Sequence, residues 1–420
     1  MSGAYHDHVI LGTGCHPVLF YCLRILVIGS GGREHALCWK LAQNKSCTIY
    51  ATPGNPGMAT CATCLPSANS FRPGLTIVGP ETPLADGIVD RCRERGWPII
   101  GPTAAAARIE TSKAFAKAVM QQAGIATARY ILVQSEQDAV AALQRFPFPV
   151  VLKADGLAAG KGVVIAHTRD EARRAIAELL AQSGRLIIEE FLIGEEVSFI
   201  VLTDGVHVTP FEPAQDHKAV FDEDEGPNTG GMGAYSDGRI LSAVEQQAVI
   251  DSVIHPALDY MRRQGCPFTG FLYAGLMMTA DGPKVLEFNC RLGDPETQVL
   301  MHRLESDLVG TLLAPGSAQL TWKTDPSVCV VLAAKGYPEI VRTGDPISGI
   351  EQVRNGVVFQ AGTKMNSDAL LTSGGRVLGV TASGPSLKEA IANTYAEVRK
   401  IHFDGMHYRT DIGRKGLKRW

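Results

Sequence analysis

The feature that most constrains the fold is a repeated order of apolar strand, glycine-rich turn and helix near the start of the chain. The apolar run 23–28 leads into Gly29-Ser30-Gly31-Gly32 and then into a helical pattern. The runs 75–78 and 97–100 are each followed by a Gly-Pro turn in the same way. Strands joined by helices lie parallel in one sheet, and the turns at their carboxyl ends bind ligands. The order therefore predicts an N-terminal parallel sheet with a ligand site along one edge.

The size and charge of the chain narrow the class of protein. Its 420 residues exceed what one core accommodates, so about two to four domains are expected. Hydrophobic residues make up 45% and charged residues 20%, as in an ordinary soluble globular protein. The net charge of −3 argues against a nucleic-acid partner, because such proteins need a basic face.

The cysteines and the apolar runs indicate the compartment. Ten irregularly spaced cysteines fit reduced cytoplasmic thiols better than a disulfide framework. Cys61-x-x-Cys64 lacks the second pair that a zinc site needs. No apolar run approaches the ~20 residues that span a bilayer, so no membrane partner is expected. Residues 1–22 contain no Lys or Arg, unlike a signal peptide, and are left as an extension without assigned function.

A second glycine-rich stretch, residues 150–165, has the pattern of a hairpin. An apolar run ends at Lys153, a loop of small residues follows, and a β-branched run returns. Backbone N–H groups in such a loop can close on an anion. The spacing Gly156-x-x-x-Gly160-Lys161-Gly162 is not that of a Walker A loop, which also needs a Ser or Thr. A flexible hairpin with solvent-facing lysines remains the alternative.

The first turn is interpreted as a phosphate cradle at a helix N-terminus. Glu34 replaces the third glycine of a dinucleotide fingerprint, so an NAD-dependent oxidoreductase is only weakly supported. Farther along, strand alternation places Glu287 and Asn289 on one face. Two such oxygen ligands suit Mg²⁺ when phosphates and water complete its shell. A plain surface strand is the alternative for this pair.

Several strings together resemble those of the phosphoribosylamine–glycine ligase family, within the ATP-grasp superfamily. They are residues 29–35, 153–162, 228–235 and 287–296, with 270–275 and Arg409-x-Asp411-Ile412-Gly413 in addition. The resemblance covers roughly residues 23–413. Because these strings are long, they point to the family rather than only to the superfamily.

The resemblance implies an α/β fold with an N-terminal parallel-sheet (pre-ATP-grasp) domain, a central α+β ATP-grasp domain and a small C-terminal mixed domain. We place the domains at 23–110, 111–322 and 323–420, with the hairpin 150–165 as a flap in the second. The family usually fits a strand and a helix where this chain has only the Pro- and Gly-rich segment 52–75. The first domain is therefore expected to lack one βα unit.

The resemblance also implies the activity. Glycine, ATP and 5-phosphoribosylamine would give glycinamide ribonucleotide, ADP and phosphate through glycyl phosphate, a step of purine biosynthesis. The implied cofactors are ATP and Mg²⁺ (or Mn²⁺), and a cytoplasmic monomer is expected. The alternatives are another ATP-grasp ligase, such as a carboxylase, and a non-catalytic ATP-binding homologue impaired by the missing unit.

The resemblance carries over to individual positions. The expected contacts of ATP are Lys113 and Lys153 at the phosphates, Gly156, Gly160, Lys161 and Gly162 in the flap, Glu189, Glu190, Phe191 and Leu192 at the adenine, and Glu196 at the ribose. The expected metal ligands are Glu287 and Asn289. The expected substrate contacts are Gly31, Gly32, Arg33, Asn55, Glu81, Asn228 and Gly230 for phosphoribosylamine, and Asp216 and Lys218 for glycine or the amine. Arg291 is expected to steady the acyl phosphate and, with Lys153 and Asp216, to be catalytic.

Overall fold

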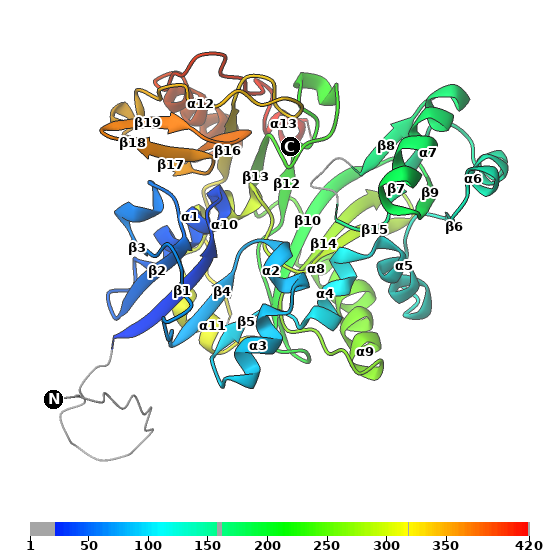
Figure 1. Cartoon of the computed structure of the whole chain (residues 1–420), viewed down its shortest axis with the longest axis horizontal. Helices are drawn as coiled ribbons and strands as arrows, with labels where there is room; N and C mark the ends of the chain where they lie inside the picture. Colours follow the sequence, from blue (N-terminus) through cyan, green and yellow to red (C-terminus); the bar gives the residue numbers. More distant parts are fainter. Residues whose placement is uncertain (1–21, 158–161, 318, 419–420) are drawn as a thin grey trace.

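The N-terminal region forms the parallel sheet that the strand–turn–helix order predicts. The structure, a computed structural model, describes residues 22–157, 162–317 and 319–418. Five strands lie in the order β3-β2-β1-β4-β5, and every neighbouring pair is parallel (Figure 1). Their bounds are β1 (Leu23–Gly29), β2 (Cys47–Pro53), β3 (Thr63–Cys64), β4 (Leu75–Val78) and β5 (Ile99–Ile100).

The helices of this region are short. The helical stretch 81–94 is divided at Gly87, whose φ of 76° ends a regular helix. The stretch 104–122 is divided at Ser112, whose side chain accepts a hydrogen bond from the Phe115 N–H and so caps the second piece. The helices are α1 (Gly32–Leu41), α2 (Glu81–Ala85), α3 (Ile88–Glu94), α4 (Ala104–Thr111) and α5 (Lys113–Gln122).

The segment 52–75, where one βα unit is expected to be missing, contains little regular structure. It contains one turn of 3-10 helix, Met58–Thr60, and the two-residue strand β3, which pairs in parallel with β2. No α-helix occurs within this segment, all of which the structure describes. The loss of one βα unit relative to the family stays a prediction.

The flap belongs to a four-stranded antiparallel sheet of order β6-β9-β7-β8. Lys153 in β7 pairs with Val163 in β8, which confirms the predicted hairpin. Gly160 and Lys161 lie outside the described residues. The elements are β6 (Tyr130–Val133), α6 (Glu136–Ala142), β7 (Val150–Ala154), β8 (Val163–Ala166), α7 (Arg169–Ser183) and β9 (Leu186–Glu190).

A nine-stranded antiparallel sheet forms the centre of the molecule. Its order is β15-β14-β10-β12-β13-β16-β20-β17, and β11 also pairs with β10. The first strands are β10 (Glu195–Thr203), β11 (Val208–Pro210), β12 (Ala214–Asp216), β13 (Gly233–Ser236), β14 (Gly270–Thr279) and β15 (Gly282–Asn289), and the last are β16 (Ser327–Ala333), β17 (Val357–Gln360) and β20 (Arg376–Ser383).

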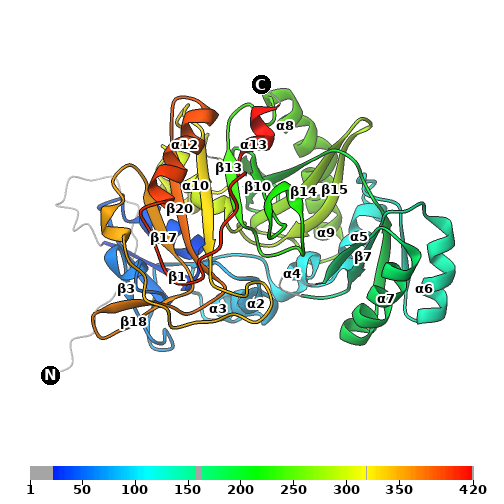
Figure 2. The same ribbon diagram turned by 90° about the horizontal axis from the view of Figure 1, so that it is seen from above.

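The C-terminal region is continuous with this sheet. Gly233 in β13 pairs with Val330 in β16, so the strands expected in a separate domain extend the central sheet (Figure 2). The domain boundary at 322/323 therefore stays a prediction. The remaining elements are α8 (Ala243–Val249), a π-helical turn (Ile250–Ile254), α9 (His255–Arg263), α10 (Glu296–Arg303), α11 (Leu308–Leu313), β18 (Thr363–Asn366), β19 (Ala369–Thr372), α12 (Leu387–Val398) and α13 (Arg414–Leu417).

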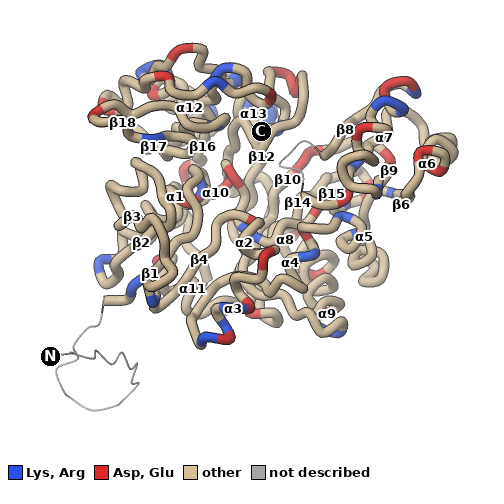
Figure 3. Tube along the Cα trace, in the orientation of Figure 1, with Lys and Arg blue, Asp and Glu red and all other residues tan. Residues whose placement is uncertain are grey.

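Charges are spread over the whole molecule. Figure 3 shows Lys and Arg interspersed with Asp and Glu along the described trace, in keeping with the small net charge. Among the described residues, no helix combines the length and the apolar character needed to cross a membrane.

A buried histidine links the N-terminal sheet to the C-terminal strands. His35 in α1 is 5% exposed, and its Nδ1 accepts a hydrogen bond of 2.8 Å from the Gln360 N–H. Burial lowers the pKa of His35 to about 4. The neutral ring is thus the form that the folded chain favours.

A pH dependence of stability follows from the burial of His35. Because the folded pKa lies below the usual value of 6.5, the contribution of His35 to stability is complete above pH 6.5 and is lost as pH falls toward 4. Relative to a His35→Gln variant, the wild type should lose about 1.4 kcal/mol per pH unit in that window. Denaturant unfolding at pH 7 and pH 4.5 measures this difference. Equal losses in the two proteins would contradict it.

Candidate active site

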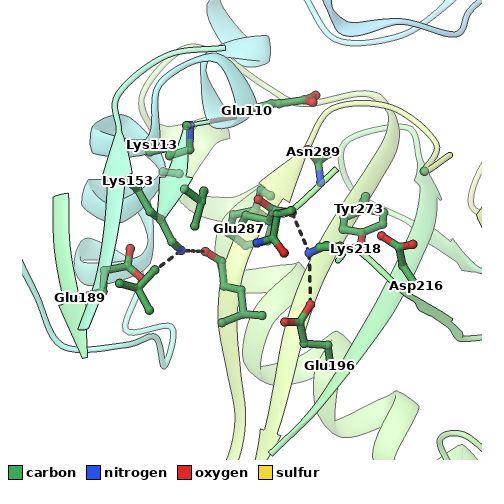
Figure 4. A pocket seen from close by; sticks show the side chains of 18 of the residues that line it. Glu110, Lys113, Lys153, Glu189, Glu196, Asp216, Lys218, Tyr273, Glu287 and Asn289 are labelled. Atoms are coloured by element: carbon green, nitrogen blue, oxygen red, sulfur yellow. Dashed lines mark hydrogen bonds and ion pairs between the residues drawn. The ribbon is translucent and has the colours of Figure 1, made fainter. Parts of the chain in front are cut away.

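One cavity collects most of the residues that the sequence singles out. It has a volume of about 290 Å³ and lies between the flap sheet and the central sheet. Figure 4 shows Lys113, Lys153 and Glu189 on one side and Glu287, Lys218 and Asp216 on the other. The predicted residues that line it are Glu81, Lys113, Lys153, Gly156, Gly162, Glu189, Glu190, Phe191, Leu192, Glu196, Asp216, Lys218, Asn228, Gly230, Glu287, Asn289 and Arg291.

Two lysines share one buried carboxylate at the flap side. The Glu189 Oε2 lies 2.9 Å from the Lys153 Nζ, and its Oε1 lies 3.0 Å from the Lys117 Nζ. Burial lowers the pKa of Lys117 to about 8, although Glu189 opposes this shift. Sequence reasoning missed Lys117. Its position four residues after Lys113 on α5, and hence on the same helix face, is the signal that could have found it.

The base of the flap is tied to the start of α5. The Lys113 Nζ donates a 2.8 Å hydrogen bond to the Gly156 carbonyl. The Asp155 Oδ1 accepts hydrogen bonds of 3.1 Å from the Ser112 hydroxyl and from the Ala114 N–H. Desolvation lowers the pKa of Lys113. A lysine and the flap backbone therefore meet at the cavity wall. Asp155 is a second residue that sequence reasoning missed.

On the opposite side, Lys218 lies between two carboxylates. Its Nζ is 3.2 Å from the Glu196 Oε2 and 3.5 Å from the Glu287 Oε1. Lys218 foremost, with Lys153, Lys113 and Arg291, lowers the pKa of Glu287 to about 2 against the effect of burial. Burial opposes the charge on Lys218, yet Glu196 and Glu287 hold its pKa well above the usual value. Glu287 is therefore an anion at neutral pH.

The predicted metal ligands fit a cation that arrives with phosphates. Glu287 and Asn289 stand two positions apart on β15, opposite Gly275 and Tyr273, and both line the cavity. The described residues contain no group of three or more His, Cys, Asp or Glu arranged to hold a metal ion. One ionised carboxylate and one amide oxygen suit Mg²⁺ only when other ligands, such as phosphate oxygens, complete its shell.

Arg291 joins the N-terminal region to the site. Its Nη2 is 2.9 Å from the Glu110 Oε1, and its Nε is 3.3 Å from the Glu81 Oε2. The Glu110 carboxylate also accepts a 2.7 Å hydrogen bond from the Cys290 N–H. Burial disfavours the charge of Arg291, but the two carboxylates keep its pKa above the usual value. Sequence reasoning predicted Arg291 and Glu81. It missed Glu110, which lies on α4, whereas Glu81 lies on α2.

Asp216 is a buried carboxyl with an unused oxygen. Its Oδ1 has no hydrogen-bond partner among the described residues. Burial, with Glu296 next in effect, raises the pKa of Asp216 well above the usual value. Behind it, the Ser198 hydroxyl lies 2.9 Å from the Tyr273 hydroxyl and donates a 2.9 Å hydrogen bond to Glu296. Asp216 and Glu296 thus form an acidic end of the site. No site role was predicted for Ser198, Tyr273 or Glu296.

In the turn predicted to bind a phosphate, a side chain of the following helix occupies one of the backbone N–H groups. The Glu34 carboxylate accepts a 2.6 Å hydrogen bond from the Gly31 N–H and lies 2.6 Å from the Arg33 Nε. The Asn55 amide donates to the Ser30 and Gln360 carbonyls at 2.8 Å. The four predicted phosphoribosylamine contacts Gly31, Gly32, Arg33 and Asn55 do not line the cavity. Glu34, which replaces the fingerprint glycine, is the physical reason that the Gly31 N–H is occupied.

The chain matches three consecutive family descriptions along its length. They are Phosphoribosylglycinamide synthetase, N domain, over residues 23–110, its ATP-grasp (A) domain over 111–297, and its C domain over 327–415. It is 46% identical to the phosphoribosylamine–glycine ligase of Halalkalibacterium halodurans, covering 94% of this chain and 97% of that protein. It is 47% identical to that of Pseudomonas aeruginosa, covering 94% and 99%.

Solved structures agree with these matches. A phosphoribosylamine–glycine ligase from Thermotoga maritima superposes with a TM-score of 0.84 at 33% identity, covering 93% of this chain and 100% of that one. The biotin carboxylase domain of the Hydrogenobacter thermophilus 2-oxoglutarate carboxylase, with MgADP, gives 0.68 at 15% identity over 92% and 91%, a likeness of fold alone. The three family matches, the identity and the shared architecture together show that the chain belongs to the phosphoribosylamine–glycine ligase family of ATP-grasp enzymes.

Proposed function

We propose that this chain joins glycine to 5-phosphoribosylamine with cleavage of ATP, giving glycinamide ribonucleotide, ADP and phosphate in purine biosynthesis. The observation that carries the proposal is the cavity in which Lys113, Lys153, Glu287 and Arg291 converge. Phosphoryl transfer requires charge neutralisation and positioning more than covalent chemistry, and these four side chains provide both. Identities of 46% and 47% to ligases over 94% of the chain do not favour a non-catalytic homologue or another ATP-grasp ligase.

ATP would lie across the flap side of the cavity. The charges of Lys113 and Lys153 would meet its phosphates under the backbone of Gly156 and Gly162. The chain segment Glu190–Leu192 would line the adenine, and Glu196 would accept from the ribose hydroxyls. We propose that Glu189 acts through its two lysines, because both of its oxygens are within 3.0 Å of them.

Glu287 and Asn289 would hold Mg²⁺ (or Mn²⁺) beside the phosphates. When bound, such an ion neutralises phosphate charge. The chain contributes an ionised carboxylate, because the pKa of Glu287 is lowered to about 2. Release of Glu287 from Lys218 would free that lysine to face the second substrate.

The substrates would meet at the acidic end. The glycine carboxylate attacks the γ-phosphate, forming an O–P bond while ADP leaves, and the sugar amine then attacks the acyl carbon while phosphate leaves. Asp216 and Lys218 would contact glycine or the sugar amine, and Arg291 would stabilise the charge on the acyl phosphate. Asn228, Gly230 and Glu81 would face phosphoribosylamine.

We also propose that the chain acts as a cytoplasmic monomer. Within the described residues, the nine cysteines form no disulfide bond, which suits a reducing compartment.

The test is an assay of the purified chain with ATP, Mg²⁺, glycine and freshly made phosphoribosylamine. ADP release should require both glycine and phosphoribosylamine, and glycinamide ribonucleotide should form in equal amount. Nucleotide binding without such turnover would support a non-catalytic homologue. Turnover with a different carboxylate or amine would instead support another ligase.

A further inference from the structure

The C-terminal string Arg409-x-Asp411-Ile412-Gly413 takes no direct part in the site described above. It packs against the loop that carries part of that site, residues 217–230, which we call the site loop. Asp216 and Lys218 line the cavity, and the side chain between them, His217, is buried on the opposite side. The His217 Nε2 lies 3.4 Å from the Gly413 N–H. The tail therefore lies directly behind two of the proposed substrate contacts.

Arg409 is the centre of this contact. It is fully buried, and its Nη1 donates a 3.1 Å hydrogen bond to the carbonyl of Ala219, the residue after Lys218. The same Nη1 is 3.0 Å from the Asp224 Oδ1, and two further hydrogen bonds of 2.8 and 2.7 Å join Arg409 to Asp411. One guanidinium thus links the first branch and the tip of the loop to the tail.

The tip of the site loop has a backbone that needs support. Glu223 and Asp224 adopt φ values of 58° and 59°, which side chains with a Cβ disfavour. The tail provides that support, because the Glu223 N–H donates to Asp411 at 3.0 Å, and the Thr410 N–H donates to Asp222 at 2.7 Å. Strained backbone persists only where its surroundings hold it.

The fixed tip determines the position of the residues near the cavity. Thr229 donates through its N–H at 2.7 Å and through its hydroxyl at 2.8 Å to the Lys218 carbonyl. Ala219 also pairs with Asn228 across the loop. Hydrogen bonds across the loop therefore hold two cavity residues, Lys218 and Asn228. The tip of the same loop is hydrogen-bonded to residues 410 and 411 of the tail.

We propose that residues 409–413 act as a clamp that positions Lys218 and the 228–230 turn for the binding of glycine and phosphoribosylamine. The clamp touches no substrate, so its residues are positioning residues. It rests on the proposed function, in which Lys218 and Asn228 meet glycine and phosphoribosylamine. The proposed phosphate contacts Lys113 and Lys153, which come from the flap side, should not depend on it.

The test compares Arg409→Gln, Arg409→Lys and the peripheral variant Asp222→Asn with the wild type. For Arg409→Gln, KM for glycine or phosphoribosylamine should rise about tenfold or more, with KM for ATP within about twofold. Arg409→Lys should recover part of this loss, and Asp222→Asn should show a smaller rise of the same kind. The matched control is Arg342→Gln, because Arg342 forms ion pairs with Asp345 and Asp404 away from the site. It should leave all three KM values unchanged.

Hydrogen exchange provides a readout independent of turnover. The amides of residues 219–229 should exchange faster in Arg409→Gln and in Asp222→Asn than in the wild type, while those of β7 and β9 should not. Unchanged exchange in this loop, or equal rises in KM for all three substrates, would overturn the clamp. If Arg409→Gln does not fold, the exchange and KM values of Asp222→Asn decide the matter. Absence of turnover in the wild type would overturn the proposed function but not the clamp, because hydrogen exchange of residues 219–229 tests the clamp without turnover.

Discussion

A Glu287→Gln variant is expected to lose about 10³-fold or more in kcat while it keeps its fold. Glu287 is the ionised member of the proposed metal pair, and four basic groups hold its pKa at about 2. The amide keeps the shape but removes the charge that a divalent ion and the surrounding lysines need. The side chain is 36% exposed, so its neutralisation should leave the far-ultraviolet spectrum and cooperative unfolding in place.

The control for this result lies in the same hairpin. Asp281→Asn also removes one negative charge between β14 and β15, at an exposed turn outside the cavity, and should retain normal kcat. The two variants are compared by steady-state ADP release at saturating Mg²⁺ and by titration of Mg²⁺. Near-normal turnover of Glu287→Gln would contradict the proposal that Glu287 holds the metal ion.

An Arg291→Met variant is expected to lose both activity and stability. The guanidinium is 2.9 Å from Glu110 and 3.3 Å from Glu81, and its removal takes this ion-pair partner from the buried Glu110 carboxylate and from the partly buried Glu81 carboxylate. Such a loss costs about 3–5 kcal/mol of unfolding free energy. Loss of the charge proposed to face the acyl phosphate should lower kcat by about 10²–10³-fold. Denaturant unfolding and ADP release measure the two effects.

A second substitution separates these two roles. In Arg291→Met/Glu110→Gln, one unpaired carboxylate becomes neutral, so part of the lost stability should return. Activity should not return, because no positive charge is restored. Recovery of activity along with stability would show that Arg291 serves only to hold the N-terminal region against the site.

Local sequence patterns predicted those parts of the molecule in which neighbours along the chain are also neighbours in space. The strand–turn–helix order predicted the parallel sheet, because each strand, turn and helix is a local unit. The small-residue loop after Lys153 predicted the hairpin of β7 and β8. Alternation along one strand placed Glu287 and Asn289 together. In each case the period of the backbone itself determines which side chains share a face.

Contacts between segments that are distant in the sequence could not be predicted from local sequence patterns. The Glu34 carboxylate accepts a hydrogen bond from the Gly31 N–H, and the local glycine pattern did not predict this contact. Lys117 reaches Glu189 across 72 positions of chain, and Glu110 reaches Arg291 across 181. The sequence by itself determined the order of the elements and the chemical types of the site. Only the tertiary structure decided which charges pair, since pairing depends on how separate elements pack and on the burial that strengthens their fields.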